Sequence, residues 1–259
     1  MAKLVSSVVS SVKSLKDLIR TDLPDDEIAD EEMTILQHLE ELRRRIVIIA
    51  VAILVTTTLS LIFTPRILEF LKTAAPPGTQ LQYIEVTEMF VTYFEVALMM
   101  GVGLSLPIIV WHVVRFITPG LTRREKRLLV TMLPLVLIFF VLGAAFGYFV
   151  TLHYALGYLL HLFPEVAIPQ IRIGNYISFV TTILFWMGLS FELPVIIYTI
   201  CKIGLVTPNR LTKFRKYAIL IFFVIAAVIT PTPDPLNQTL VAAPMIVLYE
   251  VGILMARIA

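Results

Sequence analysis

Long apolar runs decide what this chain can fold into. Four runs of at least 18 residues are followed by two shorter ones, at 46–63, 89–110, 128–150, 176–200, 217–229 and 239–255. A helix rises ~1.5 Å per residue, so about 20 apolar residues cross the ~30 Å hydrocarbon core of a bilayer. Apolar residues make up 58% of the 259 residues, which is more than the polar exterior of a soluble domain allows. The sequence predicts an all-α polytopic membrane protein with six transmembrane helices.

The last two runs are short. As a helix, 217–229 covers only ~20 Å, so either this pair of segments is re-entrant or the membrane thins around it. Both alternatives leave the C-terminus on the same side of the membrane.

Lysine and arginine are distributed very unevenly between the two sides. Of the 21 cations, 18 fall in the N-terminal segment, the 111–127 loop, the 201–216 loop and the C-terminus. Because positive loops stay on the cytoplasmic side, we expect a multi-pass protein of the cytoplasmic (inner) membrane with both termini cytoplasmic.

The first 33 residues differ from the rest, so we expect an N-terminal extension at 1–33 and a six-helix membrane domain at 34–259. Apolar residues at helical spacing in 1–20 fit an amphipathic helix on a lipid surface, with an unordered tail as the alternative. An acidic linker follows, and Thr34 opens a helix with a capping box.

Two long outer connections, 64–88 and 151–175, contain apolar stretches that do not suit free loops. The first contains apolar residues such as Ile67, Leu68, Phe70 and Leu71. We expect short helices there, so that the two connections form a cap over the outer ends of the spans.

The 115–127 loop holds a single carboxylate, Glu125. Around it lie five cations, Arg115, Arg123, Arg124, Lys126 and Arg127. Pro119 and Gly120 interrupt any helix before these charges. A second acidic group, Glu40 and Glu41, precedes the first span, and the alternative to a binding role is i,i+4 pairing with Arg44 and Arg45, worth ~0.2–0.5 kcal/mol each.

Three carboxylates fall within the apolar runs: Glu95, Glu192 and Glu250. An ionisable group at the bilayer centre costs at least ~2.5–3.5 kcal/mol on insertion scales. Glu95 and Glu250 lie near span ends, and we expect Arg257 or headgroup water to satisfy Glu250. Glu192, two residues before Pro194, has no cation within sequence reach. Either it belongs to a functional polar pocket, or it is a protonated group that hydrogen-bonds two helices.

The turn at 230–238 is polar. Asp234 or Asn237 is expected to cap the last helix, and Gln238 is expected to lie on the same polar path through the membrane as Glu192.

The chain has four dispersed histidines and one cysteine, with no catalytic, metal-ligand or phosphate-loop motif. We therefore expect no enzyme, no cofactor, no metal and no nucleic-acid partner.

Four motifs in this order resemble the TatC family, the receptor subunit of the twin-arginine protein translocase. They are the HLEELR sequence at 38–43, FITPGL at 116–121 with Glu125, FELP at 191–194, and the Thr-Pro…Asp-Pro…Gln run at 230–238 with LYE at 248–250. The resemblance covers about 34–257. It implies a curved, glove-like arrangement of six helices, with an outer cap and short fifth and sixth helices that thin the bilayer.

The resemblance also implies roles for individual residues. Signal-peptide arginines would bind Glu125 and a surface around Glu41, with Leu39 and Arg43, while Phe116 supports the loop. Glu192 would be the intramembrane carboxylate and Gln238 a polar contact beside it. The loop and partner-docking region would comprise Pro119, Gly120, Pro194, Asp234 and Glu250.

The partners implied are twin-arginine signal peptides on folded cargo, TatB-like and TatA-like single-span subunits, further copies of the chain in a multimeric receptor complex, and membrane lipids. The receptor would nucleate a translocon driven by the proton-motive force.

Three departures from the family pattern stand out: Glu95 replaces a common lysine, the proline run is one residue longer, and residues 1–33 are additional. A proton-coupled secondary transporter that uses Glu192 is the alternative function, although such proteins usually contain internal repeats. A purely structural scaffold is the third.

Overall fold

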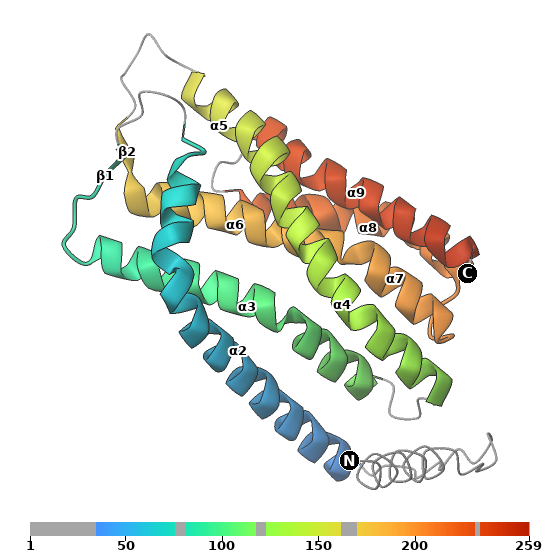
Figure 1. Cartoon of the computed structure of the whole chain (residues 1–259). Helices are drawn as coiled ribbons and strands as arrows, with labels where there is room; N and C mark the ends of the chain where they lie inside the picture. Colours follow the sequence, from blue (N-terminus) through green and yellow to red (C-terminus); the bar gives the residue numbers. More distant parts are fainter. Residues whose placement is uncertain (1–34, 76–80, 118–122, 162–169, 231–233, 259) are drawn as a thin grey trace, which may run out of the picture. The chain divides into compact units, whose positions relative to one another are not determined.

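The computed structural model describes residues 35–75, 81–117, 123–161, 170–230 and 234–258, and these belong to one unit that begins at Thr34. The described chain is almost entirely helical (Figure 1). In chain order the elements are α2 (Ile35–Lys72), β1 (Leu81–Gln82), α3 (Glu88–Ile117), α4 (Arg123–Phe146), the π-helix η1 (Gly147–Thr151), α5 (Leu152–His161), β2 (Ile171–Arg172), α6 (Ile173–Phe191), α7 (Leu193–Lys202), α8 (Pro208–Ile229) and α9 (Pro235–Ile258).

Five helical stretches in the described chain are long and apolar enough to cross a membrane. They are Leu36–Lys72, Glu88–Phe116, Leu129–Leu159, Ile173–Lys202 and Pro235–Ile258. The fifth predicted segment, 217–229, lies in α8, whose first turns carry Arg210, Lys213 and Arg215 and leave a short apolar remainder. The predicted all-α polytopic fold with a short fifth segment is confirmed.

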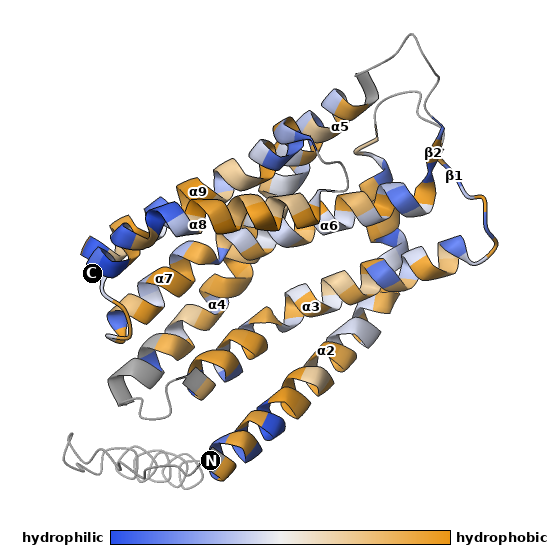
Figure 2. Cartoon of the chain, turned by 180° about the vertical axis from the view of Figure 1, so that it is seen from behind, coloured by the Kyte–Doolittle hydropathy of each residue, from blue (hydrophilic) through white to orange (hydrophobic). Residues whose placement is uncertain are grey.

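The helices share two ends. At one end α2, α4 and α8 begin while α3, α7 and α9 end (Figure 1). Most of the described arginines and lysines lie here, so we call it the basic end. Hydropathy coloring shows hydrophilic residues at the helix ends and apolar ones along the spans (Figure 2). We call the opposite end, where β1 meets β2, the clasp end.

Helix α6 forms the center of the core. Its residues Ile177, Val180, Ile183 and Met187 are at most 1% exposed. Helix α4 approaches α6 closely because Gly143 has no side chain: a Cβ there would lie 2.5 Å from the carbonyl oxygen of Met187. Gly147, four residues later, also faces Met187, so small residues at this spacing let the two helices come close.

The expectation of separate short helices after the first span is wrong. Ile67 to Leu71 are helical, but they continue α2, which runs unbroken through Pro65. A proline has no N–H to donate to the carbonyl four residues earlier, here that of Leu61. The Tyr93 hydroxyl of α3 donates a hydrogen bond to this carbonyl instead, so the helix continues without an unpaired acceptor.

The two outer connections are joined directly. Strand β1 pairs with β2 in parallel, with Leu81 opposite Ile171 and Gln82 opposite Arg172. This pairing connects residues about 90 positions apart, and no pattern in the sequence predicted it.

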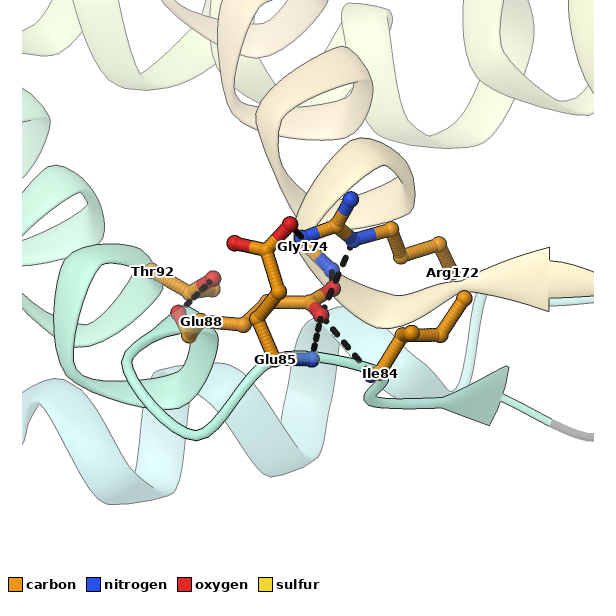
Figure 3. Close-up of polar contacts among 6 residues, drawn as sticks. All are labelled: Ile84, Glu85, Glu88, Thr92, Arg172 and Gly174. Atoms are coloured by element: carbon orange, nitrogen blue, oxygen red, sulfur yellow. Dashed lines mark hydrogen bonds and ion pairs between the residues drawn. The ribbon is translucent and has the colours of Figure 1, made fainter.

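Beside the strands, Glu88 is the center of a polar cluster (Figure 3). Its Oε2 accepts hydrogen bonds from the N–H groups of Ile84 (3.0 Å) and Glu85 (3.4 Å), and its Oε1 accepts one from Gly174 (2.7 Å). Arg172 forms ion pairs with Glu88 and with Glu85, both at 2.9 Å. Hydrogen bonding to Glu88, and then to Glu85, raises the pKa of Arg172. We call β1, β2 and this cluster the clasp, which fixes the start of α3 against the start of α6.

Candidate functional site

At the basic end, the first turns of α2 face the last turns of α3. His38, Glu41 and Arg45 follow each other on α2 at i, i+3 and i+7, which places them on one side of the helix. His112 and Phe116 are one turn apart on α3. The rings of His38 and Phe116 stack with centroids 4.4 Å apart and planes inclined by 15°. These five residues form what we call the α2–α3 site.

Arg45 links the two helices of this site. Its Nε donates to Glu41 Oε1 at 3.1 Å, and its Nη2 contacts the same oxygen. Its Nη1 donates to the carbonyl oxygen of His112 at 3.3 Å. The Arg45 side chain is only 9% exposed. Of the two predicted alternatives for Glu41, the i,i+4 pairing with Arg45 is therefore present.

Two polar atoms of the α2–α3 site have no partner among the described residues. They are Glu41 Oε2 and His112 Nδ1, and both are buried. A buried acceptor without a donor costs free energy. The site therefore retains capacity for hydrogen bonds that the described chain does not use.

The other predicted recognition residues are placed to different extents. Leu39 and Arg43 are exposed on α2, next to the α2–α3 site. Glu125 belongs to the first turn of α4, but its side chain lies outside the described residues, as do Pro119 and Gly120. The backbone thus places Glu125 at the same end of the helices as Glu41.

Glu192 lies at the break between α6 and α7. The side chain is buried, with 1% of the residue exposed, and Pro194 beside it is also buried. Neither carboxyl oxygen has a hydrogen-bond partner of ordinary geometry among the described residues. The backbone of Phe140 on α4 is a polar neighbor. Glu192 is therefore a carboxyl group inside the protein that makes no hydrogen bond of ordinary geometry within the described residues.

An apolar groove of about 420 Å³, including space open to the surroundings, lies between α3, α4 and α7. Three helices contribute its walls: Trp111 and Val114 from α3, Leu129 and Val136 from α4, and Val195 and Thr199 from α7. Val195 and Thr199 follow Glu192 by three and seven residues, and Leu129 follows Glu125 by four. The groove thus extends between the levels of the two predicted carboxylates.

The structure shows which of the two predicted residues caps the last helix. Asp234 Oδ1 accepts a hydrogen bond from the N–H of Asn237 at 2.8 Å, so Asp234 is the cap. Gln238 follows in the first turn and is half-buried. At the other end of α9, Glu250 pairs with Arg215 at 2.5 Å. Of the two expected partners of Glu250, Arg257 and headgroup water, the prediction of Arg257 is wrong: Arg257 donates to the Thr212 hydroxyl.

Sequence reasoning missed the residues that join helices. His112 carried no signal, since its role depends on α3 lying against α2. Arg172 is one of the three cations outside the four positively charged segments, and its position alone indicated no partner. Arg45 was detectable by its spacing from Glu41, but its contact with His112 was not.

The arrangement can be compared with known proteins. The sequence profile of the family described as "Sec-independent protein translocase protein (TatC)" matches residues 37–244. The chain belongs to the TatC family. The predicted resemblance is confirmed.

Individual relatives agree over most of their length. The chain is 38% identical over 232 residues to the Sec-independent protein translocase protein TatC of Carboxydothermus hydrogenoformans, covering 88% of this chain and 94% of that one. It is 33% identical over 232 residues to TatC of Escherichia coli, covering 88% and 90%. A solved structure described as "Crystal Structure of Twin Arginine Translocase Receptor- TatC" superposes with a TM-score of 0.75 at 35% identity, over 85% of this chain and 98% of that one.

Family membership establishes the general activity. This TatC-family chain is a membrane component of the twin-arginine, Sec-independent protein translocase that works with other Tat subunits, and it is not an enzyme.

Proposed function

We propose that this chain is the receptor of the translocase and binds the consecutive arginines of signal peptides on folded cargo. Binding takes place at the basic end, which faces the cytoplasm, in the cytoplasmic (inner) membrane with both termini cytoplasmic. The distribution of 18 of the 21 cations supports this orientation. Residues 34–259 act as the membrane domain and 1–33 as a separate extension.

The observation that carries the proposal is the presence of two carboxylates at one end of the helices, Glu41 at the α2–α3 contact and Glu125 in the first turn of α4. A carboxylate and a guanidinium form charge-assisted hydrogen bonds in a planar geometry that an ammonium does not reproduce. Solved relatives are described as twin-arginine translocase receptors, which supports the same role.

Charge around Glu125 sets a condition on this proposal. Five cations lie near it in the sequence and would repel a di-arginine ligand. They must therefore be neutralised by lipid phosphates when the ligand binds. The membrane lipids are partners in this sense.

The partner subunits dock near the intramembrane carboxyl. Glu192 is buried and without a hydrogen-bond partner among the described residues, so a polar group of a single-span TatA-like or TatB-like subunit satisfies it, with Gln238 as a further polar contact. The receptor then nucleates a multimeric translocon driven by the proton-motive force. The family assignment favors this role over a proton-coupled transporter that uses Glu192.

The receptor role is tested by reversing the charge of Glu125. Glu125→Lys should abolish binding of an Arg-Arg signal peptide to the purified protein, because the substitution removes the main anion and adds a sixth cation. The matched control is Glu40→Gln, which removes an exposed acid in α2 and should leave binding within about twofold. Unchanged peptide binding to Glu125→Lys would refute the receptor role.

A further inference from the structure

The two oxygens of Glu41 are in different states. Oε1 accepts hydrogen bonds from the Nε and Nη2 atoms of Arg45. Oε2 is buried and has no hydrogen-bond partner among the described residues. Arg45 is itself held by the carbonyl oxygen of His112 on α3. The guanidinium therefore fixes the orientation of the carboxylate relative to both helices.

The pairing also changes what Glu41 offers to a ligand. Its negative charge is balanced by Arg45, so it attracts a distant cation only weakly. Oε2 keeps an unfilled acceptor, which a ligand reaches when the side chains that cover it move aside. Glu41 thus offers a directed hydrogen-bond acceptor rather than a net charge.

We propose that Arg45 is a positioning residue that determines the specificity of this site for arginine over lysine. Held by Arg45, Glu41 presents Oε2 to one N–H of a ligand guanidinium. The inference rests on the proposed function, since it assigns a task within the same signal-peptide site.

The preference for arginine follows from hydration. An ammonium is a compact, strongly hydrated charge, and it needs an unbalanced anion to compensate for lost water. A guanidinium is more weakly hydrated and presents several N–H groups in one plane, so a single oriented acceptor is useful to it. The stacked rings of His38 and Phe116, one turn from Glu41, offer an aromatic surface for that plane.

The experiment compares two peptides that differ only in Arg-Arg against Lys-Lys. Their dissociation constants are measured with the full-length protein in lipid nanodiscs, for the wild type, Arg45→Gln and Arg45→Lys. Arg44→Gln is the matched control, because Arg44 is adjacent, exposed and forms no ion pair within the described residues.

We expect Arg45→Gln to bind Lys-Lys more tightly, because Glu41 regains its net charge, and the preference for Arg-Arg to fall about tenfold. Arg44→Gln should keep the wild-type preference. In Glu41→Gln/Arg45→Gln the gain for Lys-Lys should disappear, since the freed charge is absent. If Arg45→Gln does not fold, Arg45→Lys decides: it keeps the charge but loses the double contact, and its preference should fall severalfold without a gain for Lys-Lys.

An unchanged preference in the folded Arg45 variants would overturn this inference and leave the receptor role intact, provided that the wild type binds Arg-Arg and Glu125→Lys does not. Failure of the wild type to bind Arg-Arg would overturn the proposed function itself.

Discussion

Adding one methyl group at Gly101 should separate α2 from α3. A Cβ at this position would lie 2.2 Å from Thr57 Oγ1, 2.6 Å from Thr57 Cα and 2.7 Å from Thr57 N. Non-bonded heavy atoms are most stable at about 3.5–4.0 Å, so the backbone of α2 must move by about 1 Å. The hydrogen bond from Thr56 Oγ1 to the Gly101 carbonyl, 2.8 Å long, would be lost at the same time.

The magnitude follows from these two contributions. Overpacking costs about 1–3 kcal/mol, and the lost hydrogen bond costs about 0.5–1.5 kcal/mol. We expect Gly101→Ala to lower the free energy of unfolding by about 2–4 kcal/mol. Because the same two helices form the α2–α3 site, peptide binding should weaken as well.

The assay is reversible unfolding of the purified protein in mixed micelles, followed by helicity. The matched control is Gly157→Ala, since outside its own helix turn no atom of the described residues lies within 4 Å of a Cβ there, and it should be neutral or slightly stabilising. Thr57→Ala should not rescue Gly101→Ala, because the Cα and N atoms of residue 57 remain in place. Wild-type stability of Gly101→Ala, or full rescue by Thr57→Ala, would refute this account of the contact.

Two further substitutions test contacts between helices. Tyr93→Phe should lower the free energy of unfolding by about 1–3 kcal/mol, because the Leu61 carbonyl then loses the hydroxyl that replaces the missing N–H of Pro65. Adding Pro65→Ala to this variant should recover part of the lost stability. If stability does not recover, the explanation is contradicted. Glu250→Gln should change the free energy of unfolding by less than about 1 kcal/mol in the same assay. The reason is that the side chains of Glu250 and Arg215 are 41% and 44% exposed. A larger change would contradict this surface ion pair.

The sequence was sufficient for features that depend on local composition. The apolar runs located the spans, and the charged residues before 217 accounted for the short apolar part of α8. The residue types of the 230–238 turn left Asp234 and Asn237 as the candidates for the cap of α9, and Asp234 is the cap. These follow from residues close together in the chain.

Features that depend on contacts between distant segments were not predictable. The continuation of α2 through Pro65 requires a hydroxyl from α3, and the clasp requires Arg172 to meet Glu88 across 84 positions. For Glu250 the sequence offered Arg257 on the same helix, and only packing of α8 against α9 brings Arg215 to it. In the candidate site the same limit applies to the contact of Arg45 with His112.

Site-specific photo-crosslinking tests the receptor account most directly. A photoreactive residue would replace Glu41, Glu125 or, as a control at the far end of α3, Glu95, in membranes that contain an Arg-Arg signal peptide. The account predicts crosslinks to the arginine region from positions 41 and 125, none from 95, and loss of both with a Lys-Lys peptide. Crosslinks that are absent from 41 and 125, or equally strong from 95, would contradict it.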